Sequence, residues 1–193
     1  GEYPYKTILR KTTCESLPFD LMELGYSTHA IHNNEANFYG RKNVFANLGF
    51  DTFTSEEYMA EQDDTNPNDW MRDRNLTKYI MQALEETDDP DYIYTISVQG
   101  HGDYPTTMPE GFIPGITVSG FFDEEEQVQF EYYVNQIHEM DTFIGELTNM
   151  LSRRNEETVL VMYGDHLPTF NFTNDTMAVS YTHLRAHETG RNL

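Results

Sequence analysis

The sequence has little positive charge, a single cysteine and no long apolar run. Its 193 residues include 12 Lys and Arg against 33 Asp and Glu, a formal net charge of −21. Such a charge repels nucleic acid and anionic membrane surfaces, so neither is expected to bind this chain directly. The lone Cys14 excludes an internal disulfide. No apolar run approaches the roughly 18 residues that a membrane-spanning helix needs.

What the chain does contain is enough for a folded domain. Hydrophobic residues make up 38% of it and aromatic residues 13%, which favours a packed core over disorder. The simplest interpretation of the negative charge is a solvated acidic surface. Because that surface also repels anionic substrates, a phosphate or sulfate site would need a metal cation or a buried arginine to reverse the local sign.

The two ends of the chain do not look like the ends of a natural protein. It begins at Gly1 without an initiator Met, and there is no secretory signal, so we expect sequence to be missing upstream. Residues 179–193 resemble the translation of a transposon-based sequencing adapter. We therefore predict a partial catalytic domain over residues 1–178 and a non-native tail over 179–193, and expect the gene to read as adapter there.

Helical and strand-like segments alternate along the chain. Four segments are predicted as helices: Ser16–Leu24 with Ser16 as N-cap, Arg41–Leu48, a helix capped by Asp69 that runs to about Glu86, and Asp123–Arg153. Four are predicted as strands: Tyr26–Ile31, Phe50–Phe53, Tyr92–Val98 and Thr158–Tyr163. This alternation indicates an α/β fold, with a mostly parallel central sheet and helices on both faces.

Three of the strand-like runs lead to a histidine. The first ends at His32, the second leads to His101, and the third leads to Asp165 and His166. In an open α/β sheet, ligands bind in the crevice outside the carboxyl ends of the strands. We therefore predict one polar site to which all three runs contribute.

Asp165 and His166 are the candidate metal ligands. A carboxylate next to an imidazole suits Mn²⁺, Zn²⁺ or Mg²⁺. Two ligands do not hold a metal, so further donors must come from elsewhere. Taken alone, the pair fits equally a strand-end turn in which Asp165 caps the next segment.

His101, Arg41 and Tyr39 are the other candidates. His101 lies between two glycines that allow close approach of a ligand, although a surface histidine without a role would look the same. Arg41 offers a planar fork for phosphate or sulfate, and Tyr39 offers a ring and a hydroxyl. The alternative is that Tyr39 belongs to the core and that Arg41 is a solvated side chain.

Three stretches together resemble one family. They are Phe38–Phe53, Thr95–Pro105 and Val161–Pro168, and their order and spacing are similar to those of lipoteichoic acid synthases. This family is the phosphoglycerol-transferase branch of the sulfatase and alkaline phosphatase superfamily. The resemblance extends from about Tyr3 to Phe172.

The resemblance implies an extracytoplasmic catalytic domain of a bacterial membrane protein, tethered by upstream transmembrane helices. It implies one Mn²⁺ or Mg²⁺ held in part by Asp165 and His166, and a Thr nucleophile that forms a glycerophospho-enzyme intermediate. Phosphoglycerol would contact His32, Arg41 and His101, with Tyr39 where the best-known members carry Trp. Asn34 likewise replaces an Asp. The implied donor is an anionic phospholipid such as phosphatidylglycerol, and the acceptor is a polymer or glycolipid.

The nucleophile of this family is not expected within the chain. Thr12 and Thr13 precede His32 by too few residues, so the Thr and a further Glu ligand should lie upstream, and the fragment alone should be inactive. Cys14 lacks the Pro and Arg offsets of the sulfatase signature. Two alternatives remain open: a hydrolase of phosphodiesters or sulfate esters in the same superfamily, and a non-catalytic α/β module that binds glycerophosphate-bearing glycans.

Overall fold

The computed structural model describes residues 3–121 and 123–170 of the chain. These residues belong to two compact units. The first comprises Gly1–Gly100 and Glu139–Thr158, and the second comprises His101–His138 and Val159–Leu193. Among the described helices, none combines the length and the apolar character that a membrane crossing requires.

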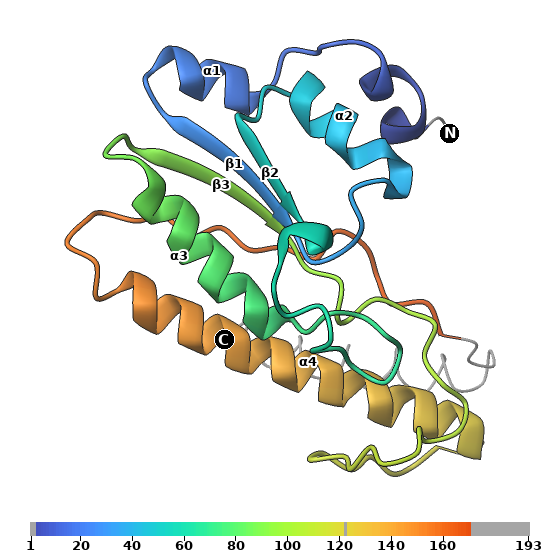
Figure 1. Cartoon of the computed structure of the whole chain (residues 1–193). Coiled ribbons are helices and arrows are strands. Elements are labelled where there is room, and N and C mark those ends of the chain that lie inside the picture. The colour runs from blue at the N-terminus through green and yellow to red at the C-terminus, as the bar shows by residue number, and fades with distance from the viewer. Residues whose placement is uncertain (1–2, 122, 171–193) are drawn as a thin grey trace, which may run out of the picture. The chain divides into compact units, whose positions relative to one another are not determined.

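The first unit is built on a small parallel sheet (Figure 1). The strands are β1 (Ser27–His32), β2 (Thr52–Ser55) and β3 (Asp91–Ile96), in the order β2-β1-β3. In the register of this sheet, His32 lies beside Ser55 on one side and Ile96 on the other. The carboxyl ends of all three strands therefore lie at one edge, as the alternating pattern predicted.

Helices cover both faces of this sheet. The chain passes from β1 to β2 through α2 (Arg41–Asn47) and from β2 to β3 through α3 (Leu76–Glu86). Because β2 and β3 flank β1 on opposite sides, right-handed crossovers place these two helices on opposite faces. The short helix α1 (Leu17–Glu23) precedes β1. The predicted α/β class with a parallel sheet is confirmed.

Aromatic residues fill the face beneath α2. Phe45 of this helix is 1% exposed, and its ring contacts those of Phe53 and Tyr94, with centroids 4.7 and 6.3 Å away. Phe53 and Tyr94 both pair with Ala30 of β1, so all three point to the same face of the sheet. The small Ala30 side chain leaves room for the larger rings.

The opposite face carries the main aliphatic core. Ile31 of β1 packs there with residues of α3 and of the second half of α4 (Glu124–Leu151). The buried members of this cluster are Ile31, Met59, Met71, Leu76, Tyr79, Ile80, Ala83, Phe143, Leu147 and Leu151. The α3 positions recur at intervals of three and four residues, as in an amphipathic helix.

In the second unit, aromatic rings form the main contacts. Tyr104, Phe130, Tyr133 and Phe170 pack against one another, with ring centroids 4.9 to 6.2 Å apart. The Asn135 side chain holds the preceding loop by accepting hydrogen bonds from the backbone N–H groups of residues 115 and 116. The predicted long loop over Gly100–Gly120 is confirmed, since the structure has no helix or strand there.

Short 3-10 turns complete the described part. They span Pro4–Lys6, Ile8–Arg10, Phe38–Gly40, Glu56–Tyr58 and Asp73–Asn75. The last of these replaces the beginning of a predicted helix. We expected Asp69 to cap a helix, but α3 begins only at Leu76. The Asn66 side chain accepts hydrogen bonds from the backbone of Asn68 and Trp70, and this turn competes with helix formation.

Ser16 is the N-cap residue of α1, as predicted, but its hydroxyl donates to the carbonyl of Leu48 and forms no capping bond. One further prediction is wrong. The apolar run Thr158–Tyr163 forms no strand, and Val159 and Tyr163 are 89% and 71% exposed. An apolar run becomes a buried strand only when a neighbouring strand satisfies its backbone, and this run pairs with none of the described strands.

Candidate functional site

His32 ends β1 as a buried, neutral imidazole. The side chain is 1% exposed, and its Nδ1 lies 2.9 Å from the carbonyl oxygen of Ile96. Because a carbonyl can only accept, Nδ1 carries the proton and Nε2 carries the lone pair. Burial, with a smaller contribution from the charge of Arg41, lowers the pKa of His32 to about 4. Among the described residues, Nε2 has no hydrogen-bond partner.

Arg41 is a buried cation at the start of α2. It is 9% exposed, and its guanidinium lies 5.0 Å from the Phe38 ring centroid and 5.8 Å from that of Tyr39. Burial lowers its pKa. No carboxylate in the described ranges lies within ion-pair distance of it. The alternative of a solvated arginine is therefore wrong. Arg41 is a buried arginine of the kind that a phosphate or sulfate site in this acidic chain would need.

The segment between His32 and Arg41 is held in a defined shape. The Glu57 carboxylate accepts the backbone N–H of Ala36 at 3.0 and 3.2 Å, and the Asn34 side chain accepts that of Glu35 at 2.7 Å. Tyr39 adopts a left-handed conformation with φ of 59°, which a non-glycine residue rarely does without support. Its ring, half exposed, lies under the amine of Lys6.

In the second unit, the structure brings His101 and His166 together. Their ring centroids are 5.7 Å apart in an edge-to-face arrangement. His101 Nδ1 donates to the carbonyl of Gly102, and His166 Nδ1 donates to that of Leu167. Each bond leaves the lone pair on Nε2, which is the arrangement that metal-bound histidines use. Asp165 Oδ1 lies 3.7 Å from His166 Nε2.

The donor chemistry of Asp165 and His166 fits a divalent cation, but only in part. Both side chains are exposed and accessible, and carboxylate plus imidazole suits Mn²⁺ or Mg²⁺ with further oxygen ligands. Within the described residues no group of three or more His, Cys, Asp or Glu side chains could hold a metal. A metal role for Asp165 and His166 stays a prediction.

The predicted residues form two sets. His32, Tyr39 and Arg41 belong to the first unit, and His101, Asp165 and His166 belong to the second. The structure brings Arg41 to the Tyr39 ring in the first set, and His166 to both His101 and Asp165 in the second. A common pocket that joins the two sets stays a prediction.

Three buried polar residues near His32 were missed by the sequence analysis. Asn33, Asp73 and Gln99 are 0 to 2% exposed and hydrogen-bonded to one another. No local pattern singles them out, because Asn33 lies 40 residues and Gln99 26 residues from Asp73. Asp73 in particular fell inside a predicted helix, where a carboxylate would normally face solvent.

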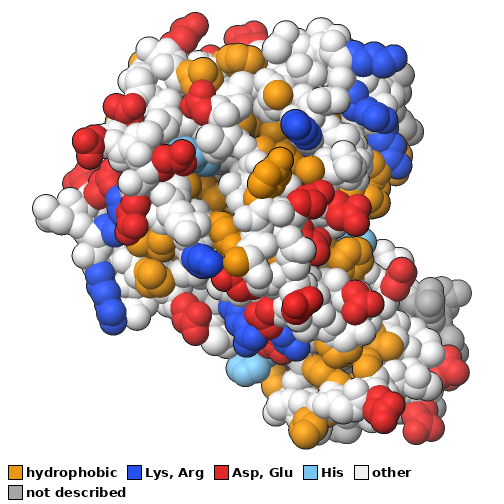
Figure 2. Space-filling model, in the orientation of Figure 1, with side chains coloured by type: hydrophobic (Ala, Val, Ile, Leu, Met, Phe, Trp, Pro, Cys, Tyr) orange, Lys and Arg blue, Asp and Glu red, His pale blue; other side chains and the backbone are white. Residues whose placement is uncertain are grey.

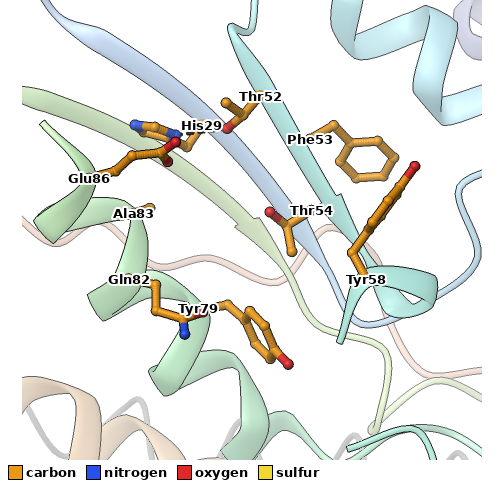
Figure 3. A pocket seen from close by; sticks show the side chains of 9 residues that line it. All are labelled: His29, Thr52, Phe53, Thr54, Tyr58, Tyr79, Gln82, Ala83 and Glu86. Carbon is orange, nitrogen blue, oxygen red and sulfur yellow. Dashed lines mark hydrogen bonds between the residues drawn. The ribbon is translucent and has the colours of Figure 1, made fainter. Parts of the chain in front are cut away.

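A cavity of about 490 Å³ lies between β2 and α3, on the face of the sheet that α3 covers (Figure 3). His29 lines it and links the three strands, because Nδ1 bonds to the Thr52 hydroxyl at 2.7 Å and Nε2 to Asp91 at 3.2 Å. None of the predicted site residues lines this cavity. We interpret His29 as a structural link rather than a member of the site.

The acidic residues do not form a site of their own. On the face drawn in Figure 2, Asp and Glu side chains are spread over the surface rather than gathered around one hollow. This distribution agrees with a solvated acidic surface. Positive side chains lie near the segment of Arg41: the Lys6 amine lies over the Tyr39 ring, and the Arg10 side chain approaches Gly40.

A parallel sheet with helices on both faces defines an α/β domain. Solved structures show the same fold. The lipoteichoic acid synthase LtaP from Listeria monocytogenes superposes with a TM-score of 0.64 at 24% identity, over 78% of this chain and 36% of that one. The Streptococcus pyogenes phosphoglycerol transferase GacH, solved with sn-glycerol-1-phosphate, gives 0.56 at 23% identity, over 68% and 34%.

The family model described as "Sulfatase" matches residues 1–189. The chain therefore belongs to the sulfatase family. A candidate cyclic β-1,2-glucan modification protein of Rhizobium meliloti is 31% identical over 89% of this chain and 26% of its own length. Lipoteichoic acid synthase 2 of Bacillus subtilis is 26% identical, over 87% and 25%. The chain thus spans about a quarter of the length of these curated relatives.

Proposed function

We propose that this chain is part of the catalytic domain of a metal-dependent phosphoglycerol transferase. The enzyme would move glycerol phosphate from an anionic phospholipid to a polymer or glycolipid acceptor. Relatives named as lipoteichoic acid synthases and a phosphoglycerol transferase support this activity. An extracytoplasmic location, with membrane-spanning helices outside this chain, belongs to the same proposal.

One observation carries the proposal: the charge of a buried cation acts on a buried hydrogen-bond acceptor. Arg41 provides a desolvated guanidinium without a carboxylate partner in the described residues, and after burial its charge is the second cause that lowers the pKa of His32. Arg41 therefore suits the phosphate of phosphoglycerol. His32 Nε2 bears a lone pair, so it suits a glycerol hydroxyl, which can donate, rather than an ionised phosphate oxygen.

The second unit would complete the site. We assign Asp165 and His166 as two ligands of one Mn²⁺ or Mg²⁺, and His101 as a further contact to phosphoglycerol. When bound, the cation would stabilise charge that develops on the transferred phosphoryl group. His101 and His166 each hold Nδ1–H on a backbone carbonyl, so both rings are already oriented before a ligand arrives.

The reaction would proceed in two displacements at phosphorus. In the first, a Thr hydroxyl outside this chain attacks, the bond to the lipid oxygen breaks, and diacylglycerol leaves with the proton. In the second, an acceptor hydroxyl attacks the glycerophospho-enzyme, and the Thr hydroxyl is restored. Arg41 would bind the phosphoryl oxygens in both steps, and His32 would fix the glycerol end.

The direct test supplies phosphatidylglycerol labelled in its glycerol headgroup to the full-length protein in membranes. The proposal predicts release of diacylglycerol and label in a larger acceptor product. Free glycerol phosphate would instead identify a hydrolase of the same superfamily. Binding without release of diacylglycerol would identify a binding module.

A second test uses the purified 193-residue chain. The proposal predicts that it binds sn-glycerol-1-phosphate through Arg41 and His32 but does not turn over a phosphatidylglycerol analogue. Turnover by this chain alone would refute the assignment of the nucleophile to a residue outside it. A matched control is Arg74→Lys, since Arg74 pairs with Asp64 on the surface.

A further inference from the structure

Asp73 is a fully buried carboxylate in the turn that precedes α3. It is 0% exposed. Its Oδ1 accepts a 2.9 Å hydrogen bond from the Asn33 side chain and a longer one, 3.4 Å, from the backbone N–H of Gln99. Its Oδ2 is buried and has no partner among the described residues. A buried carboxylate with one unpaired oxygen is costly to keep, so its presence calls for a reason other than stability.

The first partner of Asp73 is the residue next to His32. Asn33 follows the end of β1 and is also 0% exposed. Its side-chain amide donates to Asp73 and to the carbonyl of Met71 at 2.8 Å. Because both amide protons form hydrogen bonds, the Asn33 side chain has one orientation. These bonds restrain the backbone directly after His32.

The second partner leads to His101. Gln99 lies three residues beyond β3 and two before His101. Its side-chain oxygen accepts the backbone N–H of Asp73 at 2.8 Å, so Asp73 and Gln99 bind each other reciprocally. Asn66 donates to the Gln99 carbonyl at 3.1 Å. The start of the loop that continues to His101 is thereby attached to the same carboxylate as the end of β1.

We propose that Asp73 is a positioning residue of the phosphoglycerol site, which holds the ends of β1 and β3 in register through Asn33 and Gln99. This inference rests on the proposed function and deepens it. Asp73 contacts neither the lipid nor the acceptor. It acts through His32 and through the loop that carries His101, so its removal would displace the two imidazoles rather than remove a ligand contact.

The charges around Asp73 agree with this role. Burial is the main cause that raises the pKa of Asp73 to about 6; its hydrogen bonds oppose this rise, and the charge of Glu139 in α4 adds to it. Glu139 is itself bonded to Arg72 and to the Gln99 side chain. Among the described residues Asp73 forms no ion pair, and its carboxylate accepts hydrogen bonds from the neutral amides of Asn33 and Gln99.

The experiment compares Asp73→Asn with Asp64→Asn in the purified chain. Asn keeps the shape of Asp and one accepting oxygen but removes the charge, so the bonds from Asn33 and Gln99 become ordinary neutral ones. Asp64 pairs with Arg74 and Arg72 in the same connecting segment. Two quantities are measured by NMR: the ¹⁵N signals of the His32 ring, and the affinity for sn-glycerol-1-phosphate. We expect Asp73→Asn to shift the His32 signals and weaken binding about fivefold, because hydrogen bonds to a charged acceptor become bonds to a neutral one. Asp64→Asn should change neither.

Asn33→Ser provides a second route, because it breaks the same bond from the β1 side. Its effect on binding and that of Asp73→Asn should be non-additive in the double variant, as for two partners in one interaction. Additive effects would overturn the inference, as would an Asp73→Asn variant with unchanged His32 signals and unchanged affinity.

Failure of the proposed function has a different signature. If the wild-type chain does not bind glycerol phosphate, the proposed substrate is wrong. The inference about Asp73 is then judged on the His32 ring signals alone. A shift in Asp73→Asn but not in Asp64→Asn supports it, and no shift overturns it.

Discussion

The side-chain amide of Asn33 donates a 2.9 Å hydrogen bond to the carboxylate of Asp73, forty residues further along the chain. This bond joins the end of β1 to the turn before α3. Both residues are completely buried. A pKa of about 6 leaves the Asp73 carboxylate mostly ionised at neutral pH, although burial favours its protonated form. The same small region holds His32, whose pKa is shifted in the opposite direction.

The opposed shifts of His32 and Asp73 predict a distinctive dependence of stability on pH. The pKa of His32 falls from 6.5 to about 4 on folding, so its contribution is present above pH 6.5 and is lost as pH falls towards 4. The pKa of Asp73 rises from 3.8 to about 6, so its contribution is present below pH 3.8 and is lost as pH rises through 6. In wild type the two slopes largely cancel between pH 4 and 6.

Single variants should reveal each slope. With Asp73→Asn, the His32 term remains and the free energy of unfolding should rise from pH 4 to 6.5, by about 3 kcal/mol at most. With His32→Asn, the Asp73 term remains and the free energy should fall over pH 4 to 6 by a similar amount. Urea unfolding at several pH values measures both. Parallel profiles for the two variants and wild type would show that neither shift exists.

Alanine substitutions at two glycines should distinguish the cost of backbone strain from that of a steric clash. Gly25 and Gly49 have φ of +87° and +85°. A Cβ at Gly25 would meet nothing within 4 Å, whereas one at Gly49 would lie 2.8 Å from the Phe19 ring. Gly25→Ala should cost about 1 kcal/mol through strain alone. Gly49→Ala should cost at least about 1 kcal/mol more because of overpacking. Equal losses in denaturant unfolding would mean that Phe19 moves aside freely.

Replacement of Arg41 by Lys should weaken phosphate recognition while keeping the charge. Lys lacks the planar fork, so we expect about tenfold weaker binding of sn-glycerol-1-phosphate. The stacking of the guanidinium over Phe38 would also be lost. Isothermal titration of the purified chain measures the effect, with Arg74→Lys as control. Wild-type affinity in Arg41→Lys would remove Arg41 from the site.

Asp165→Asn should weaken binding of Mn²⁺, because it removes the charged donor of the pair. In wild type, Mn²⁺ should broaden the NMR signals of the His166 ring, and the variant should need roughly tenfold more metal for the same broadening. Glu110 is an exposed carboxylate in the same unit. The control variant Glu110→Gln tests whether Mn²⁺ is attracted non-specifically to acidic side chains. Similar broadening in wild type and Asp165→Asn would argue against a metal role for Asp165.

Part of the fold follows from local chemistry. Gly25 and Gly49 follow the ends of α1 and α2 as predicted, and β1 ends at His32. The run Thr158–Tyr163 shows the limit of such reasoning. Its composition is as strand-like as that of β3, but a strand exists only with a neighbour to bond, and composition does not specify that neighbour.

The alternation of helices and strands, the spacing from His32 to Arg41 and the residue types at the strand ends can be read from the amino-acid order. Three properties emerge only in the folded chain: His32 is neutral with its lone pair on Nε2, Arg41 is buried, and Asp73 is hydrogen-bonded to Asn33 and Gln99. The physical reason is that these properties depend on the removal of water and on partners dozens of residues away. A pKa, a tautomer and a buried hydrogen bond belong to the packed environment, not to the segment that carries the side chain.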